Sequence, residues 1–233
     1  MKKNSNKYIF IYATILVVVV AVALSVVAVL LKPRQQANAD KEKMQSLLAA
    51  IGVQSTLDET PELYKKYFTT EWAVNLDGEK VQSDIAPFNL DVKKQLALAE
   101  KRDPSTLLPI FGFEKDGKKG YVVPLYGAGL WGDIWGYIAL AEDFNTILGV
   151  TFGHESETPG LGAEIATEKF QNRFVGKKIL DQNGTFTSVK VLKKADESSD
   201  NQVDAISGAT ITSLAVSTML EKTLALYQNA FDK

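Results

Sequence analysis

The chain has 233 residues, a formal net charge of −2 at pH 7, no cysteine and a single histidine. This charge gives no support for a nucleic-acid partner. The lack of cysteine excludes disulfides, cysteine-ligated iron–sulfur clusters and a cysteine nucleophile. Because His154 is its only histidine, the chain has no multi-histidine metal site of its own, and we expect no bound metal.

The first element in chain order is an uncharged apolar segment, residues 8–31, with the sequence YIFIYATILVVVVAVALSVVAVLL. As a helix it is roughly 36 Å long, enough to cross the ~30 Å hydrocarbon core of a bilayer. A cleavable signal peptide is the alternative, because ANA at residues 37–39 resembles a cleavage site. The apolar run, however, exceeds the usual length of about 7–15 residues. We therefore expect residues 1–34 to form a short cytoplasmic tail and an uncleaved transmembrane anchor.

Basic residues flank the apolar segment on both sides, namely Lys2, Lys3, Lys7, Lys32 and Arg34. The positive-inside rule therefore discriminates little between the two orientations. A short basic tail followed by one span usually stays inside while the long domain is exported. We expect residues 33–233 to lie outside the cytoplasm.

The stretch after the anchor is predicted as a linker and the N-terminal part of a soluble domain, residues 35–119. Residues 35–40, QQANAD, are polar and are interpreted as the linker. Helical periodicity predicts three helices, over residues 40–53, 60–68 and 90–101. The remainder of residues 72–105 is weakly patterned and receives no assignment.

Alternating apolar runs predict strands from residue 107 onwards. Two hairpins are expected, over residues 107–127 and 132–155, and a further strand over residues 184–194. The last element is a helix over residues 209–231, whose apolar stripe is formed by Val216, Leu220, Leu224, Tyr227 and Phe231. This order predicts an α+β fold: one N-terminal transmembrane helix, then an antiparallel sheet with packed helices.

Two glycine-rich stretches lie on the predicted hairpins. In YGAGLWGDIWGY, residues 126–137, Trp131 and Trp135 offer flat apolar surface among four glycines. Taken alone, this stretch favours the alternative, a bulged hairpin with buried tryptophans. GHESETPGLGAEI, residues 153–165, has backbone donors suited to a planar ligand or an anion: Thr158, Gly160, Leu161 and Gly162. A structured surface loop with an ordinary hydrogen-bonded His154 is the alternative.

The third stretch, DAISGATITS at residues 204–213, leads into the last helix. With Ser207 as the N-cap, the first turn holds Gly208, Ala209 and Thr210, whose free N–H groups favour a phosphate. The small side chains leave room for it, and the Thr210 hydroxyl is close enough to be esterified. Plain capping by Ser207 is the alternative.

Read together, these stretches resemble the FMN-binding domain family, and within it the C subunits of Na+-translocating NADH:quinone reductases. The resemblance covers about residues 120–216 and implies an FMN-binding domain over residues 120–233. It implies FMN joined through its phosphate to Thr210 of the Ser-Gly-Ala-Thr motif. The implied cofactor-binding residues are Ser207, Gly208, Ala209, Glu157, Thr158, Gly160, Leu161, Gly162 and Trp131. Asp204 matches the acid that a flavin transferase recognises; that enzyme takes FMN from FAD outside the cytoplasm with Mg²⁺.

The resemblance further implies a single-pass flavoprotein subunit of the bacterial inner membrane, with its soluble domain on the periplasmic side. Such a subunit relays electrons within a complex that couples NADH oxidation and ubiquinone reduction to Na+ export. It has no catalytic acid, base or nucleophile of its own, and its partners are the other subunits, the lipid bilayer and the flavin transferase. Two alternatives remain: the G subunit of the related Rnf complex, which oxidises ferredoxin, and a membrane-anchored binding or scaffolding domain without redox function.

Overall fold

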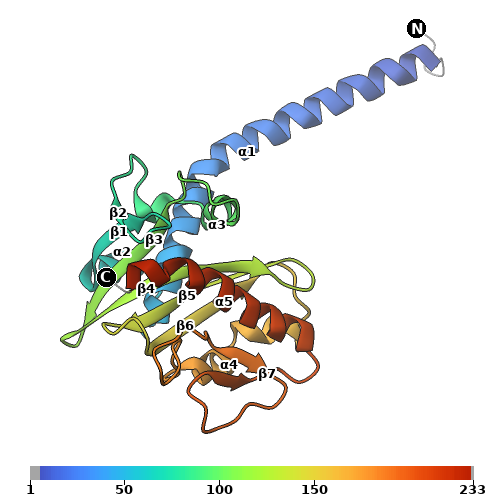
Figure 1. Cartoon of the computed structure of the whole chain (residues 1–233). Coiled ribbons are helices and arrows are strands. Elements are labelled where there is room, and N and C mark those ends of the chain that lie inside the picture. The colour runs from blue at the N-terminus through green and yellow to red at the C-terminus, as the bar shows by residue number, and fades with distance from the viewer. Residues whose placement is uncertain (1–5, 232–233) are drawn as a thin grey trace. The chain divides into compact units, whose positions relative to one another are not determined.

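A computed structural model describes residues 6–231 of the chain (Figure 1). Residues 1–5, which include Lys2 and Lys3 of the expected tail, lie outside the described residues. The chain divides into two compact units, Met1–Lys43 and Met44–Lys233.

Helix α1 (Asn6–Ala50) begins in the first unit and ends in the second. It is long and apolar enough to cross a membrane, and its most apolar window has no buried residue. Residues 35–40, predicted as a polar linker, are helical and continue α1; Gln36 Nε2 donates to Asp40 Oδ1 at 2.8 Å, one turn later. Polar character does not interrupt a helix in the way that glycine does.

The second unit is built on a six-stranded antiparallel sheet with the strand order β2-β1-β3-β4-β5-β6. Its strands are β1 (Phe68–Val74), β2 (Lys80–Val81), β3 (Leu108–Lys115), β4 (Lys118–Ala128), β5 (Asp133–Ala141) and β6 (Ile147–His154). The pairs β3–β4 and β5–β6 confirm the two predicted hairpins, and the α+β class is confirmed. Strand β1 lies partly in the region that the sequence left without assignment.

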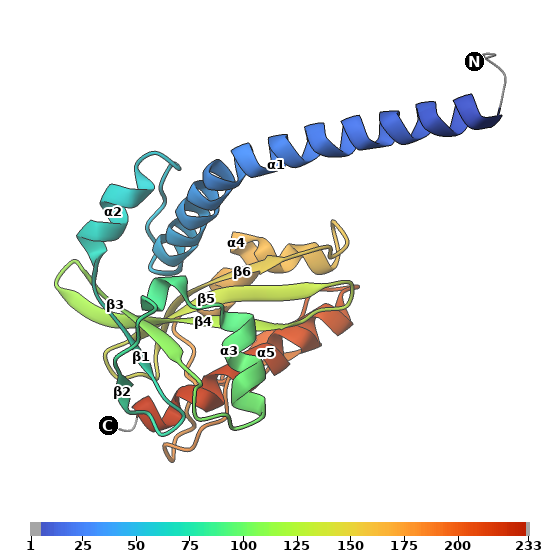
Figure 2. The ribbon, with the colours of Figure 1, turned by 90° about the horizontal axis from the view of Figure 1, so that it is seen from above.

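Buried apolar side chains form one cluster on each face of this sheet, and helices lie on both sides of it (Figure 2). On β5, Ile138 and Leu140 belong to one buried cluster, whereas Tyr137 and Ala139 belong to the other. Successive side chains of a strand point to opposite faces, so β5 reads as a continuous apolar run. This double burial fixes the positions of β4, β5 and β6, whose ends carry two of the motif stretches.

Helix α5 (Thr210–Phe231) packs on the first of these faces and confirms the predicted last helix. Of the predicted stripe, Val216, Leu220, Leu224 and Tyr227 are buried, and Tyr227 Oη donates to the Pro109 carbonyl oxygen at 3.1 Å. The other face carries the last turn of α1, with Leu47 and Leu48, and α2 (Thr60–Tyr67). The predictions of helices at residues 60–68 and 90–101 are confirmed by α2 and α3 (Val92–Glu100).

The remaining elements are short: η1 (Pro87–Asn89), η2 (Gly162–Ala166), α4 (Glu168–Gln171), η3 (Asn172–Phe174), β7 (Lys190–Leu192) and β8 (Gln202–Asp204). Strands β7 and β8 pair in parallel in a separate two-stranded sheet. The predicted strand over residues 184–194 is therefore largely wrong. Gly184 and Ser188 have φ of +78° and +56°, which interrupts the extended backbone before β7.

Candidate functional site

The segment Asp204–Ser213 connects β8 to α5 through a tight turn. The Ala209 N–H closes this turn by donating to the carbonyl oxygen three residues earlier at 3.1 Å. Gly208 has a φ of +79°, a left-handed conformation that favours glycine and is not helical. Helix α5 therefore begins only at Thr210. The prediction that Ser207 caps a helix whose first turn includes Gly208 is wrong, because Ser207 lies within the turn.

Four hydroxyl groups of this segment lie in different environments. Thr212 and Ser213 are 2% and 0% exposed. Thr212 Oγ1 donates to Glu157 Oε2 at 2.7 Å, and Ser213 Oγ accepts a backbone N–H of the preceding turn at 3.0 Å. Ser207 and Thr210 are exposed, and only Thr210 belongs to the first turn of α5. The free N–H groups and the dipole of that turn favour a negative group.

Glu157 is a buried carboxylate, 4% exposed, that joins three segments of the chain. Its Oε1 accepts the backbone N–H groups of Leu130 at 2.7 Å and Trp131 at 3.0 Å, both in the loop between β4 and β5. Its Oε2 accepts the Thr212 hydroxyl at the start of α5. Both carboxylate oxygens therefore accept hydrogen bonds from the protein itself, and Glu157 joins the β4–β5 loop to the start of α5.

These hydrogen bonds decide the ionisation of Glu157. Burial alone raises the pKa of the Glu157 carboxyl group, because it disfavours the charged form. The donors from Trp131, Thr212 and Leu130 outweigh burial, so the pKa lies below its usual value. The site therefore contains a fixed negative charge at neutral pH.

Two glycines permit the close approach of these segments. A Cβ atom at Gly162 would lie 2.3 Å from Glu157 Oε2 and 2.6 Å from Thr212 Oγ1. A Cβ atom at Gly129 would lie 2.5 Å from Glu157 Oε1. No side chain larger than hydrogen fits at either position without moving the carboxylate.

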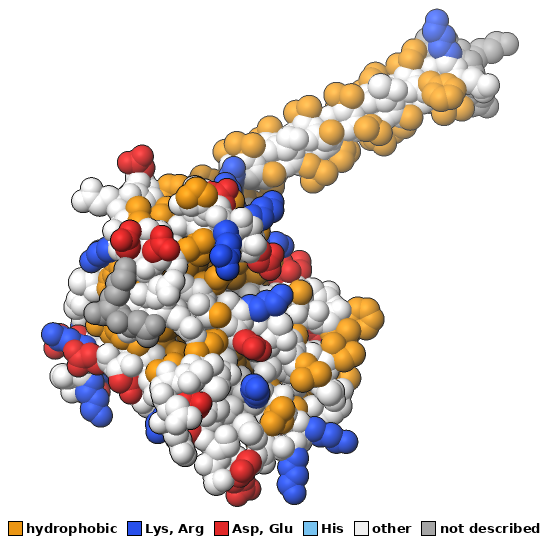
Figure 3. Space-filling model, viewed as in Figure 1, with side chains coloured by type: hydrophobic (Ala, Val, Ile, Leu, Met, Phe, Trp, Pro, Cys, Tyr) orange, Lys and Arg blue, Asp and Glu red, His pale blue; other side chains and the backbone are white. Residues whose placement is uncertain are grey.

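Each of the three segments joined at this site exposes large apolar side chains. Trp131 is 65% exposed and Leu161 is 41% exposed, and Leu130, Ile211 and Leu214 are also exposed. Leu161 packs toward the turn before α5, since its Cδ2 lies 3.0 Å from where a Cβ of Gly208 would stand. Hydrophobic side chains gather at this end of the second unit, beside the start of α5 (Figure 3). The alternative of buried tryptophans is wrong, because Trp135 is also exposed, at 41%.

The loop that follows β6 uses several of its polar groups internally. The N–H of Leu161 donates to the Thr158 carbonyl oxygen at 3.1 Å, so Leu161 offers its side chain rather than its N–H to a ligand. Gly160 has a φ of +74° and open space around its Cα. His154 Nδ1 accepts the Glu157 N–H at 3.3 Å, which makes it an ordinary hydrogen-bonded histidine.

Asp204 lies at the end of β8 and is exposed. Its Oδ1 accepts the Ala195 N–H at 2.8 Å, and Arg173 Nη1 donates to the Asp204 carbonyl oxygen at 2.7 Å. The acid upstream of the motif thus fixes the bend between β7 and β8, besides presenting a carboxylate to solvent.

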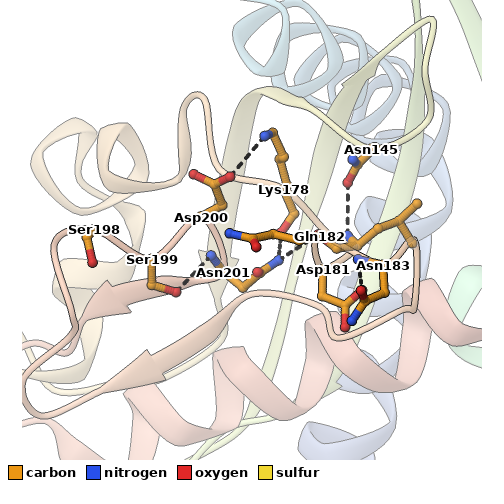
Figure 4. A pocket seen from close by; sticks show the side chains of 10 residues that line it. Asn145, Lys178, Asp181, Gln182, Asn183, Ser198, Ser199, Asp200 and Asn201 are labelled. Atoms are coloured by element: carbon orange, nitrogen blue, oxygen red, sulfur yellow. Dashed lines mark hydrogen bonds and ion pairs between the residues drawn. The ribbon is translucent and has the colours of Figure 1, made fainter.

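A polar hollow of about 530 Å³ lies elsewhere, between the β5–β6 turn and the loops around β7 (Figure 4). Its polar side chains are used within the fold: Asn145 Oδ1 accepts the N–H groups of Ile179 and Leu180, and Asn201 Nδ2 donates to the Leu180 carbonyl oxygen. Over residues 6–231, no group of three or more His, Cys, Asp or Glu side chains is arranged to hold a metal ion.

This chain is similar in sequence and in fold to known proteins. A family model described as "FMN-binding domain" matches residues 129–225. The C subunit of the Na+-translocating NADH-quinone reductase of Vibrio vulnificus is 31% identical over 202 residues, which cover 81% of this chain and 79% of that protein. The crystal structure of the corresponding C subunit from Parabacteroides distasonis superposes with a TM-score of 0.79 at 41% identity, over 87% of this chain and 98% of that chain.

The crystal structure of Shewanella oneidensis NqrC is similar as well, with a TM-score of 0.71 at 28% identity over 83% of this chain and 97% of that chain. The residues matched by the family model include Trp131, Glu157 and Thr210. Glu157 accepts hydrogen bonds from the Trp131 N–H and from Thr212, two residues after Thr210. This chain belongs to the family of the C subunits of Na+-translocating NADH-quinone reductases.

Proposed function

We propose that this chain is a membrane-anchored flavoprotein subunit that relays electrons through FMN bound covalently to Thr210. The observation that carries the proposal is the Thr210 residue, which is exposed at the start of α5, on one of three joined segments that expose large apolar side chains. A phosphate ester there keeps a negative charge at a helix N-terminus, where the dipole stabilises it. The names of the relatives support placing the subunit in a Na+-translocating NADH:quinone reductase.

The residues present fit the flavin. Gly208 and Ala209 leave space for a phosphate, and Trp131 and Leu161 offer apolar surface for a planar ring. The backbone groups of Thr158, Gly160 and Gly162 are further proposed contacts of the flavin. Bound FMN supplies the electron-transfer chemistry, while these residues position the ring and limit its contact with water.

Attachment of FMN requires another enzyme, a flavin transferase. The Thr210 oxygen forms a bond to the flavin-side phosphorus of FAD, the phosphoanhydride bond breaks, and AMP leaves. The hydroxyl proton passes to a base of the transferase; among the described residues, the Thr210 hydroxyl forms no hydrogen bond to an acid or a histidine of this chain. The exposure of Thr210 allows such an enzyme to reach it.

Helix α1 anchors the subunit in the bacterial inner membrane, and the second unit lies on the periplasmic side, where it meets the other subunits. The complex couples NADH oxidation and ubiquinone reduction to Na+ export. The tether serves this role, because a covalently attached flavin stays at high effective concentration near its redox neighbours.

The test is a denaturing gel of the full chain, made in cells that flavinylate other proteins and viewed under ultraviolet light. Wild type and Ser207→Ala give a fluorescent band, and Thr210→Ala gives a dark band although the protein is present. A fluorescent Thr210→Ala band contradicts the attachment site. A dark wild-type band contradicts the flavoprotein role and favours the scaffolding alternative. Partner subunits that co-purify separate the quinone reductase from the Rnf complex.

A further inference from the structure

A hollow of about 620 Å³ lies next to the turn that precedes Thr210. Its lining includes four cationic side chains and two carboxylates, and also Ser207; the cations are Lys169, Arg173, Lys193 and Lys194. The whole chain has a formal net charge of −2. Positive charge is therefore concentrated beside the segment that carries the motif.

The hollow has a fixed frame. Arg173 Nη1 donates to the carbonyl oxygens of Asp204 and Ala205 at 2.7 and 3.2 Å, and its guanidinium lies 5.5 Å from the ring centre of the buried Phe170. Asp204 Oδ1 accepts the Ala195 N–H. These contacts join the end of β8 to the helical segment that contains Arg173. They also join it to the loop after β7 that contains Lys193 and Lys194.

The three lysines are exposed, and within residues 6–231 none of them forms an ion pair with a carboxylate. The described ion pairs join Lys93 to Asp133 and Lys178 to Asp200. Four cations and two carboxylates in the lining leave the hollow with an excess of positive charge, which an acidic partner balances on contact.

We propose that this hollow is the docking surface for an acidic face of the enzyme that esterifies Thr210. The inference rests on the proposed function, because only a flavinylated chain needs such an enzyme. Ser207 lines the hollow and lies three residues before Thr210. An enzyme whose active site reaches the Thr210 hydroxyl therefore covers the hollow, and charge complementarity requires its covering face to be acidic.

The test compares two charge reversals in the full chain. Lys193→Glu/Lys194→Glu changes the lysine pair of the hollow, and Lys118→Glu/Lys119→Glu changes a matched exposed pair at the start of β4. Each protein is incubated with purified flavin transferase, FAD and Mg²⁺, and initial rates are read from the fluorescence of gel bands. We expect the first variant to react about tenfold or more slowly than the second at low salt. The difference shrinks at about 0.5 M salt, where charges are screened.

Three further readings make the result decisive. Wild type must take up flavin and Thr210→Ala must not; if wild type takes up none, it is the proposed function that fails. Circular dichroism and the endpoint flavin content show whether the variants fold, and Lys193→Ala/Lys194→Ala with a smaller slowing confirms a charge effect. Equal initial rates for the two charge-reversed variants at low salt contradict the docking proposal.

Discussion

The candidate flavin site has an exposed layer and a buried layer, and two threonines of the stretch at residues 204–213 belong to different layers. Thr210 is exposed, whereas Thr212 is 2% exposed and donates to Glu157. Residues two apart on a helix differ by about 200° in direction, so the first turn of α5 presents one hydroxyl outward and one inward. The same ten-residue stretch therefore supplies the hydroxyl proposed for modification, on Thr210, and the hydroxyl that binds the buried Glu157, on Thr212.

The two glycines of the loop after β6 differ in the same way. Gly160 stands in open space with a φ of +74°, whereas Gly162 lies against Glu157 and Thr212. The first serves the shape of the loop, and the second serves the contact between layers. Variants at Thr210 and Thr212, and at Gly160 and Gly162, therefore distinguish the exposed layer from the buried layer by experiment.

Glu157→Ala has the largest expected effect on the buried layer. It leaves the N–H groups of Leu130 and Trp131 and the Thr212 hydroxyl without their acceptor, at a cost of about 4 kcal/mol in the free energy of unfolding. Chemical denaturation of the detergent-solubilised full chain, followed by near-ultraviolet circular dichroism, measures this loss. Glu155→Ala is the matched control, because Glu155 is exposed, and a similar loss in both variants contradicts the role of Glu157.

Gly162→Ala is expected to come next. Its Cβ would stand 2.3 Å from Glu157 Oε2, so the carboxylate has to move away from its donors. We expect a loss of about 3 kcal/mol, compared with about 1 kcal/mol for Gly160→Ala, where only the positive φ is unfavourable. The same denaturation measurement applies. The expected order is contradicted if Gly160→Ala is the more destabilising change.

Thr212→Val removes the hydroxyl that binds Glu157 and keeps the shape of the side chain. The carboxylate loses one hydrogen bond, and we expect a loss of about 2 kcal/mol. Thr210→Val, the matched variant of the exposed layer, changes stability by less than about 0.5 kcal/mol. Flavin attachment shows the opposite order: it is retained in Thr212→Val and absent in Thr210→Val. Loss of flavin from both would remove the distinction between the layers.

The smallest expected effect is a dependence on pH. The pKa of Glu157 is lowered in the folded protein, so its contribution to stability is present above the ordinary pKa of about 4.3. That contribution is lost as the pH falls through the folded-state pKa. The difference in unfolding free energy between wild type and Glu157→Gln therefore narrows below about pH 4. A difference that stays constant between about pH 6 and pH 3 would mean that Glu157 carries no special charge contribution.

Periodicity predicted the elements with a strong pattern, including both hairpins and α5, because buried stripes and alternating strands leave a direct trace in the sequence. It failed where backbone conformation depends on a turn. The positive φ of Gly208 delays the start of α5, and Ser188 breaks the expected strand before β7. The helical conformation of residues 35–40 was not predicted, because polar residues suit an exposed helix as well as an irregular linker.

The motifs located the candidate site, but they did not separate its layers. Glu157 is an acid in a polar loop, a position that is usually exposed. Its burial depends on donors from Leu130, Trp131 and Thr212, which lie 26 to 55 residues away in the sequence. The one local signal is Gly162, whose lack of a side chain admits the carboxylate.

The most direct test of the central claim is peptide mass analysis of the full chain isolated from cells that contain a flavin transferase. The account predicts that the peptide containing residues 204–213 is heavier by FMN minus one water, and that fragmentation places the added mass on Thr210. An unmodified peptide, or added mass on Ser207, Thr212 or Ser213, would contradict it.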